Sequence, residues 1–444
     1  MKKVVGLAAV LSSALLTTSA FATNGDNMIG VSPASRAMGG IGVGMCVGPT
    51  DAIFRNPAWL SREKGFNVSF GGILFMPHVK GRSKGYFDTD PANPGGVVST
   101  DTGYVTSKAD TFMIPEIAIT NQISDNVVIG IGAYGVSGMG VDYRDKNLAL
   151  GPDGKYHNGL AKMHTTLQFM RIVPAVGYKV NEALTVGGAL HLAWGSLDLG
   201  AELGYDSDGD GIPDTFFNAG GGQSQSYGIG ASLGINFKPT ENICIGASYQ
   251  SSVKMTYKNV FDSNGDGKFE DLKLEQPQEF AVGVGYRPVE TFKIGFDVRW
   301  INWSDADGYK QFKWEDQWVF AVGGEYKVTP KLALRAGYNY GKTPIKSKSN
   351  LNTANANNIP DFSQPFPDYN VEWFNLIGFP AIAEQHITLG FGYQFTEKFT
   401  LNMSYVRAFE KKVESSASVM ASKDLIAGAK NAQDSIGISL DWHF

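Results

Sequence analysis

The sequence has little charge and no excess of basic residues. Of its 444 residues 18% are charged, and 38 Lys and Arg against 43 Asp and Glu give a net charge of −5. A nucleic-acid-binding protein needs a basic surface to neutralise phosphates, so this class is excluded. Beyond its N-terminus the chain also lacks an uncharged apolar run of about 18 residues, which excludes membrane-spanning helices. It has instead 54 glycines and 12% aromatic residues, a composition that argues against disorder.

The first 22 residues are typical of a secretory signal peptide. Two lysines precede the uncharged apolar stretch 4–16, and the small residues Ala20 and Ala22 form a cleavage site. The apolar stretch is too short to anchor the chain in a membrane. We therefore predict a signal peptide over residues 1–22 and a mature chain that works outside the cytoplasm.

Most of the remaining chain alternates between apolar and polar residues. Over residues 435–444, for example, every second side chain is apolar. A period of two is typical of a β-strand with one apolar and one polar face. The pattern predicts strands at 65–78, 110–120, 126–143, 161–179, 184–202, 224–237, 243–257, 278–287, 292–303, 316–327, 331–340, 382–395, 398–411 and 435–444.

The connections between these strands decide between a soluble sandwich and a membrane barrel. Turns of a few residues alternate with long polar loops, and aromatic residues gather at the strand ends. Both features are typical of outer-membrane barrels, and a periplasmic β-sandwich would explain neither. The sequence thus predicts an all-β fold, a transmembrane 14-stranded antiparallel β-barrel over residues 65–444. The long loops are predicted at 79–109, 203–223, 258–277, 341–381 and 412–434.

Residues 23–64 precede the barrel and show no sustained alternation. They are rich in glycine and low in charge, and they include apolar side chains such as Ile29, Phe54 and Trp59. A disordered periplasmic tail is the simple alternative, but this composition favours burial. We predict that the segment is buried in the lumen of the barrel.

Motifs in this segment carry a resemblance to a known family. They are Arg36-Ala37-x-Gly39-Gly40 and the stretch from Asp51 to Asn56-Pro57-Ala58. A further motif outside the segment, Gly378-Phe379-Pro380-Ala381-Ile382, precedes the twelfth strand. Together with the strand count, these motifs make the whole mature chain similar to the FadL family of outer-membrane transporters for long-chain fatty acids and aromatic hydrocarbons.

The resemblance implies an N-terminal hatch that closes the lumen of the barrel. Members of this family pass hydrophobic molecules from an outer groove to an inner pocket, and then sideways through a gap in the wall. It therefore implies a monomer in the bacterial outer membrane whose partners are a hydrophobic small molecule and membrane lipid, without nucleic acid. The implied hatch and substrate-pocket residues are Arg36, Gly39, Gly40, Asn56, Pro57 and Ala58.

The sequence also indicates where the barrel wall is weak. Glycines in the third strand shift from one face to the other, so regular alternation fails near Gly135. Prolines in the two neighbouring strands each remove a donor from the strand ladder. Glycines that merely relieve crowding and prolines near strand ends are the simple alternative, but three defects on adjacent strands favour a lateral exit. The candidate exit residues are Pro115, Glu116, Gly132, Gly135, Gly138 and Pro174, with Glu116 on the lumenal face.

Enzymatic activity is not predicted. Residues 230–234 match the pattern G-x-S-x-G, but they lie within a strand with no following helix, and the six histidines show no ligand spacing. A passive porin for polar solutes and a non-transporting surface-binding protein remain as alternatives to a transporter of apolar molecules. Inward side chains such as Phe112, Ile114 and Phe169 are too apolar for a wet pore and favour the transporter.

Two acidic loops match the front half of an EF-hand-type calcium loop. Segments 206–214 and 262–270 each place oxygen-bearing side chains at loop positions 1, 3, 5 and 9, with glycine at position 6. The usual acid at position 12 is missing, and a solvated Asp-Gly turn is the alternative. No cofactor is required, but Ca²⁺ is a predicted ligand of these extracellular loops. The candidate ligands are Asp206, Asp208, Asp210, Asp214, Asp262, Asn264, Asp266 and Glu270.

The two cysteines are Cys46 in the predicted hatch and Cys244 at the start of the seventh strand. Both are expected to face the lumen near its periplasmic end, in an oxidising compartment. We hypothesise a disulfide that pins the hatch to the wall. Two unpaired buried cysteines are the alternative.

Overall fold

The computed structural model describes residues 24–88, 97–146, 149–150, 156–157, 159–205, 215–420 and 423–444. The predicted signal peptide lies outside the described residues, and so does the first predicted calcium loop, 206–214. The other predicted sites fall on residues that the structure describes.

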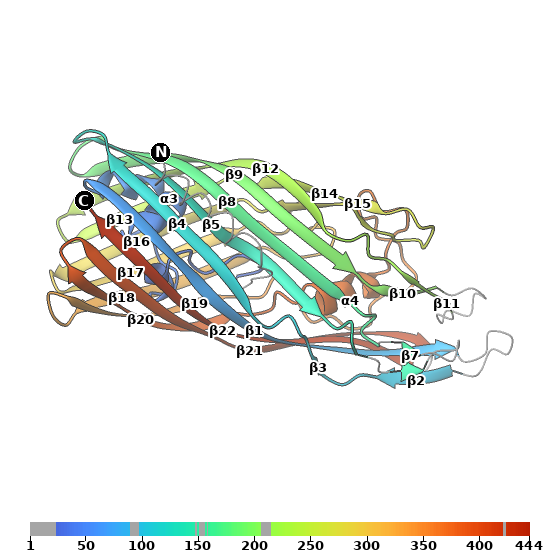
Figure 1. Cartoon of the computed structure of the whole chain (residues 1–444). Helices are drawn as coiled ribbons and strands as arrows, with labels where there is room; N and C mark the ends of the chain where they lie inside the picture. Colours follow the sequence, from blue (N-terminus) through green and yellow to red (C-terminus); the bar gives the residue numbers. More distant parts are fainter. Residues whose placement is uncertain are drawn as a thin grey trace, which may run out of the picture.

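Within the described chain, fourteen antiparallel strands close into a single barrel (Figure 1). They are β1 (Phe66–Asp88), β4 (Phe112–Gln122), β5 (Val127–Asp142), β8 (His164–Lys179), β9 (Leu184–Gly200), β12 (Ser224–Thr240), β13 (Ile243–Gln250), β16 (Glu279–Val289), β17 (Phe292–Ile301), β18 (Gln317–Lys327), β19 (Leu332–Gly341), β20 (Gln385–Thr396), β21 (Phe399–Met420) and β22 (Lys423–His443). Strands that are consecutive in this series pair along the wall, and β1 closes the barrel because it pairs with both β22 and β4. The predicted fold is confirmed.

The two faces of the wall carry different side chains. On β12, Tyr227 and Leu233 are 74% and 65% exposed, whereas Ser226 and Ser232 are buried. Exposed apolar side chains recur on the outside of the other wall strands, as expected for a surface in contact with lipid. In the described part of the chain, no helix is both long and apolar enough to cross a membrane.

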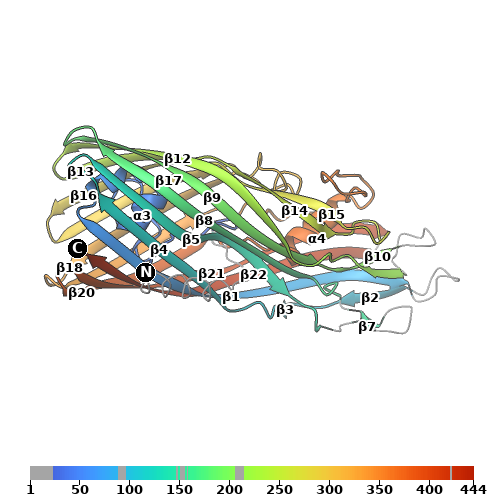
Figure 2. The same ribbon diagram turned by 45° about the horizontal axis from the view of Figure 1, so that its top comes forward.

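Three strands of the wall are longer than the sequence predicts. β1 continues to Asp88, β21 continues to Met420, and β22 begins at Lys423. The extensions project together from one end of the barrel (Figure 2). Their side chains are mostly small or polar on both faces, so the alternation that predicts a strand is lost while the strand pairing continues. The loops predicted at 79–109 and 412–434 are therefore partly strand.

The loops at this end also contain structure of their own. The predicted strand 243–257 is interrupted after β13, and β14 (Val253–Phe261) forms a separate hairpin with β15 (Glu270–Gln276). A helix, α4 (Asp368–Gly378), occupies part of the loop predicted at 341–381. The remaining short strands are β2 (Val97–Asp101), β3 (Val105–Thr106), β6 (Ala149–Leu150), β7 (Tyr156–His157), β10 (Glu202–Tyr205) and β11 (Thr215–Asn218).

The N-terminal segment, residues 24–64, lies inside the barrel at the end opposite these loops (Figure 1). We call this segment the hatch. Its apolar side chains are buried, and Ile29, Ile41 and Leu60 have no exposed surface. The hatch therefore packs within the lumen and does not form a free tail.

Prolines start the three short helices of the hatch, α2 (Pro33–Arg36), α3 (Pro49–Phe54) and the 3-10 helix η1 (Pro57–Arg62). Proline suits the first helical position because the amide hydrogen that it lacks would have no partner there. The side chains of Ser32 and Asn56 cap α2 and η1 by accepting a backbone hydrogen bond. Local sequence thus defines the turns by which the hatch folds back on itself.

Candidate functional site

A carboxylate of the wall holds the glycine-rich stretch of the hatch. Asp297 of β17 accepts hydrogen bonds from the backbone amides of Gly42, Val43 and Gly44 at 2.7, 2.8 and 3.0 Å. Hydrogen bonds to a charged acceptor are stronger than neutral ones. Asp297 is buried, so this contact ties the hatch to the wall inside the lumen.

The first predicted hatch motif contacts strands near the C-terminus. The Arg36 guanidinium donates to Ser435 Oγ of β22 at 2.6 Å, and the Gly39 amide donates to Thr388 Oγ1 of β20 at 2.9 Å. Gly40 has a φ of +81°, and a Cβ there would lie 2.0 Å from the carbonyl oxygen of Ile29. This turn of the hatch therefore requires glycine.

The second predicted motif contacts another part of the wall. Asn56 Nδ2 donates to the Val43 carbonyl at 3.0 Å, and its Oδ1 accepts from the Ala58 amide at 3.1 Å. Pro57 packs so closely on β9 that its carbonyl carbon would lie 2.3 Å from a Cβ at Gly187. The two motifs thus fix the hatch on two sides, and a role for these residues in a substrate pocket stays a prediction.

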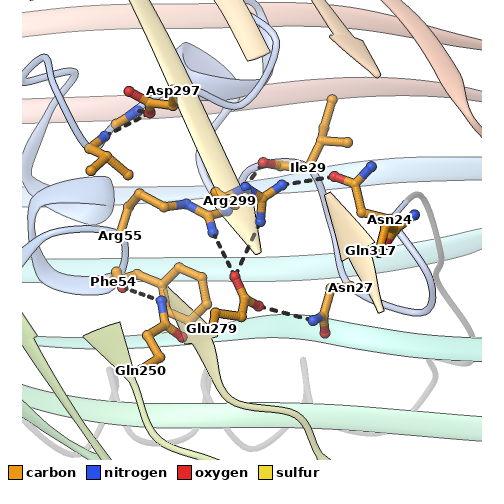
Figure 3. Close-up of polar contacts among 12 residues, drawn as sticks. Asn24, Asn27, Ile29, Phe54, Arg55, Gln250, Glu279, Asp297, Arg299 and Gln317 are labelled. Atoms are coloured by element: carbon orange, nitrogen blue, oxygen red, sulfur yellow. Dashed lines mark hydrogen bonds and ion pairs between the residues drawn. The ribbon is translucent and has the colours of Figure 1, made fainter. Parts of the chain in front are cut away.

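A buried charge cluster joins the hatch to β16 and β17 (Figure 3). The Glu279 carboxylate accepts from Asn27 Nδ2 at 3.0 Å and from Arg299 at 3.3 Å, and it lies 3.6 Å from Arg55. Arg299 also donates to Asn24 Oδ1 at 2.8 Å. One wall carboxylate is therefore shared between an arginine of the wall and an arginine of the hatch.

Two further acids of the hatch are buried without a salt bridge among the described residues. Asp26 accepts from the Tyr309 hydroxyl, and Asp51 accepts from the Ser32 hydroxyl. Burial raises the pKa of each carboxyl to about 6, although these hydrogen bonds act in the opposite direction. Both carboxyl groups therefore gain or lose their charge at mildly acidic pH.

The wall is interrupted between β4 and β5. Their ladder runs from Gln122 opposite Val128 to Glu116 opposite Tyr134 and stops there. Beyond this point β4 continues to Phe112 with β1 as its partner, while β5 continues with β8 after a register shift between Gly135 and Ser137. The predicted failure of the third strand near Gly135 is confirmed, and we call this interruption the seam.

The hatch bonds to β5 at the seam. The Met28 amide donates to the Val136 carbonyl at 3.0 Å, and the Gly138 amide donates to the Asp26 carbonyl at 3.1 Å. Asn27 and Ser137 form an isolated antiparallel bridge between these two bonds. The hatch thus satisfies backbone groups of β5 beyond the point where β4 stops pairing with it.

The other predicted exit residues lie around the seam. Pro115 is the β4 residue next to Glu116, just outside the ladder with β5. The ladder between β8 and β9 is interrupted at Val173 and Pro174. A Cβ at Gly132 would lie 1.9 Å from the Tyr134 hydroxyl, so this glycine makes room for the tyrosine side chain. Glu116 is buried within the barrel, as predicted.

The predicted disulfide is wrong. Cys46 and Cys244 line the same cavity of about 240 Å³ beside Trp59, but both are free. The Cys46 thiol donates instead to the Glu63 carboxylate, with 3.7 Å between Sγ and Oε1. Burial and this carboxylate raise the pKa of the thiol, so the reactive thiolate is disfavoured.

The described acidic loop folds as a turn. Asp262 accepts backbone hydrogen bonds from Asn264, Gly265 and Gly267, while Asp266 accepts from the amide of Lys268. The Glu270 carboxylate accepts from Ser263 and Ser363. Among the residues that the structure describes, no group of three acids, histidines or cysteines could hold a metal ion. Calcium binding stays a prediction for both loops, and calorimetry at millimolar Ca²⁺ tests it.

An aromatic cluster at the loop end of the barrel was not singled out from the sequence. Phe374 of α4 packs on Phe261, Phe312, Phe366 and Phe379, with ring centroids 5.3 to 6.4 Å apart. The sequence feature that indicates this cluster is the apolar run around Phe374, which lies within a loop expected to be polar. Because these rings come from several loops, only the fold brings them together.

A family model described as outer membrane protein transport protein (OMPP1/FadL/TodX) matches residues 9–361. The chain belongs to this family. It is therefore an outer-membrane transport protein and not an enzyme, and the predicted resemblance and location are confirmed.

Relatives and solved structures agree with this family. Outer membrane protein P1 of Haemophilus influenzae is 20% identical over 407 residues, which cover 81% of this chain and 80% of the relative. The crystal structure of a Pseudomonas aeruginosa FadL homologue is 17% identical, with a TM-score of 0.69, and covers 95% of this chain and 100% of the other. The toluene transporter TodX of Pseudomonas putida is 20% identical, with a TM-score of 0.66 and the same coverage. At these identities the structural likeness shows a shared fold.

Proposed function

We propose that this family member takes up hydrophobic small molecules, such as long-chain fatty acids or aromatic hydrocarbons, and releases them sideways into the outer membrane through the seam between β4 and β5. The observation that carries the proposal is the end of the β4–β5 ladder at Glu116 and Tyr134. Unpaired backbone is costly in lipid, so an interrupted ladder at membrane depth calls for a functional reason.

The hatch explains why the route would turn sideways. Asp297 and Glu279 bind the hatch from the wall, and the apolar residues of the hatch are buried against the barrel. A direct path to the periplasm would require these contacts to break. A path through the seam requires local change only where the hatch bonds to Val136 and Gly138.

The interior of the barrel suits an apolar cargo. Phe54, Tyr134, Phe169 and Tyr257 belong to one large buried apolar cluster that joins the hatch to the wall. An apolar molecule gains free energy when it leaves water for such surroundings and then for the bilayer. The name of the similar P. putida protein, a toluene transporter, is consistent with this cargo class.

Substitution of Gly135 tests the lateral exit. A β-branched side chain in Gly135→Val stiffens the irregular segment of β5, and we expect uptake of a labelled fatty acid or of toluene to fall at least about tenfold, or about 1.4 kcal/mol in the barrier. Gly188→Val is a matched control, because a Cβ at Gly188 of β9 meets only ordinary contacts, the nearest at 3.6 Å. Undiminished uptake by Gly135→Val contradicts the lateral exit. Rapid swelling, in small sugars, of liposomes that contain the wild-type protein identifies a porin instead.

A further inference from the structure

Two polar side chains at the last rung of the β4–β5 ladder lack a hydrogen-bonding partner. Glu116 of β4 and Tyr134 of β5 stand opposite each other in register. They are 1% and 0% exposed, respectively. Both carboxyl oxygens of Glu116 and the hydroxyl of Tyr134 form no hydrogen bond.

Other acids inside the barrel accept hydrogen bonds from the protein. Glu279, Asp297 and Asp441 accept hydrogen bonds from Asn27, hatch amides and Ser69, respectively. Within the described residues, Glu116 alone is a buried acid with both oxygens unbonded. An unsatisfied buried polar group costs about 1–3 kcal/mol, so its retention calls for an explanation.

The surroundings of Glu116 leave room for its carboxyl but provide no hydrogen-bonding partner among the described residues. A Cβ at Gly71 of β1 would lie 2.8 Å from Glu116 Oε1, so glycine there makes room for the carboxyl. The Tyr134 ring packs on Phe54 with its centroid 5.6 Å away. The buried guanidinium of Arg36 bonds to Gly30 and Ser435 instead of Glu116.

We propose that Glu116 and Tyr134 bind the polar head group of an amphiphilic cargo, a hydroxyl or a carboxylic acid, as it passes the seam. This inference rests on the proposed lateral exit. A protonated carboxyl and a phenol each donate and accept, so one hydroxyl head group can bond to both side chains. The apolar tail then lies toward the unpaired side of β4 and the lipid. A pure hydrocarbon leaves both groups unbonded, so the pair selects amphiphiles over hydrocarbons.

Dodecanol and dodecane provide the test, because they share one chain length and differ in a single hydroxyl. Initial uptake rates are measured in cells without other transporters of this family, and the ratio of dodecanol to dodecane uptake is compared between variants. We expect the ratio to fall about tenfold in Glu116→Leu and less in Tyr134→Phe. Glu116→Gln keeps a donor and an acceptor and retains most of the preference.

Thr120→Val is the matched control, because Thr120 is a buried polar residue on the same face of β4. Its uptake ratio should equal that of the wild type, and heat-modifiable electrophoretic mobility checks that each barrel is folded. A ratio that is unchanged in Glu116→Leu, or an equal loss of both cargoes, overturns the head-group site. If the wild type takes up neither compound, the proposed function itself fails.

Discussion

Arg55 of the hatch and Glu279 of the wall form a buried ion pair, with 3.6 Å between Nη1 and Oε2 (Figure 3). The same Glu279 oxygen lies 3.3 Å from Arg299. Removing one partner of a buried pair leaves an uncompensated charge, which costs about 3–5 kcal/mol. We therefore expect Glu279→Gln to weaken the attachment of the hatch.

Hydrogen exchange of the hatch amides measures this effect. Glu279→Gln should speed the exchange of residues 24–64 while the wall amides stay protected. Glu241→Gln serves as the control, because the Lys238–Glu241 pair is at the surface, with the glutamate side chain 91% exposed, and such pairs contribute little. Equal protection of the hatch in both variants would contradict the role of the cluster.

Alternation predicts a strand only where its two faces meet different surroundings. On β17, Phe296 is 46% exposed on the outside of the wall, whereas Asp297 and Arg299 are buried toward the hatch. The pattern is clear there. In the extensions of β21 and β22, Ser415 pairs with Ala427 and Val413 pairs with Ala429, and pairing with neighbouring strands maintains the structure. The sequence of one strand does not show which neighbouring strand it pairs with, so these extensions are not predicted from it.

The candidate site was predictable only where one segment carries the signal. Shifted glycines located the break near Gly135 because a bulge is a property of its own strand. The end of the ladder at Glu116 depends on two strands and on the hatch. The ion pair of Arg55 and Glu279 joins distant segments, and neither residue has a neighbour in the sequence that marks its partner.

Gly44 tests how closely the hatch fits the wall. A Cβ at Gly44 would lie 2.2 Å from the Val284 amide nitrogen of β16, so Gly44→Ala must displace the hatch or the wall. Overpacking of this kind costs about 1–3 kcal/mol. We expect the variant to let small sugars through the lumen, which liposome swelling detects.

Gly48 offers a control in the same segment. A Cβ at Gly48 meets nothing within 4 Å, and its backbone is extended. Gly48→Ala should therefore leave liposome swelling at the wild-type level. If both variants leak equally, the general flexibility of the hatch matters more than its contact with β16.

Asp26 and Asp51 make the attachment of the hatch depend on pH. Burial raises the pKa of both carboxyls from the ordinary value of 3.8 to about 6, so the attached hatch binds more protons than the released one. Their stabilising contribution is fully present below a pH near 4 and is lost as the pH rises through about 6. Each pH unit in this window corresponds to about 1.4 kcal/mol per group.

Conductance of the purified barrel in planar bilayers measures how often the hatch is released from the wall. We expect transient conducting events to become more frequent from pH 4.5 to pH 7.5, because charged carboxylates loosen the buried hatch. Asp26→Asn and Asp51→Asn together should flatten the dependence, since an amide keeps its acceptor but does not titrate. Asp145→Asn is the control, because this carboxylate lies in a loop and is partly exposed, and it should leave the pH dependence of the conductance unchanged. A frequency that falls as the pH rises would mean that other groups control the hatch.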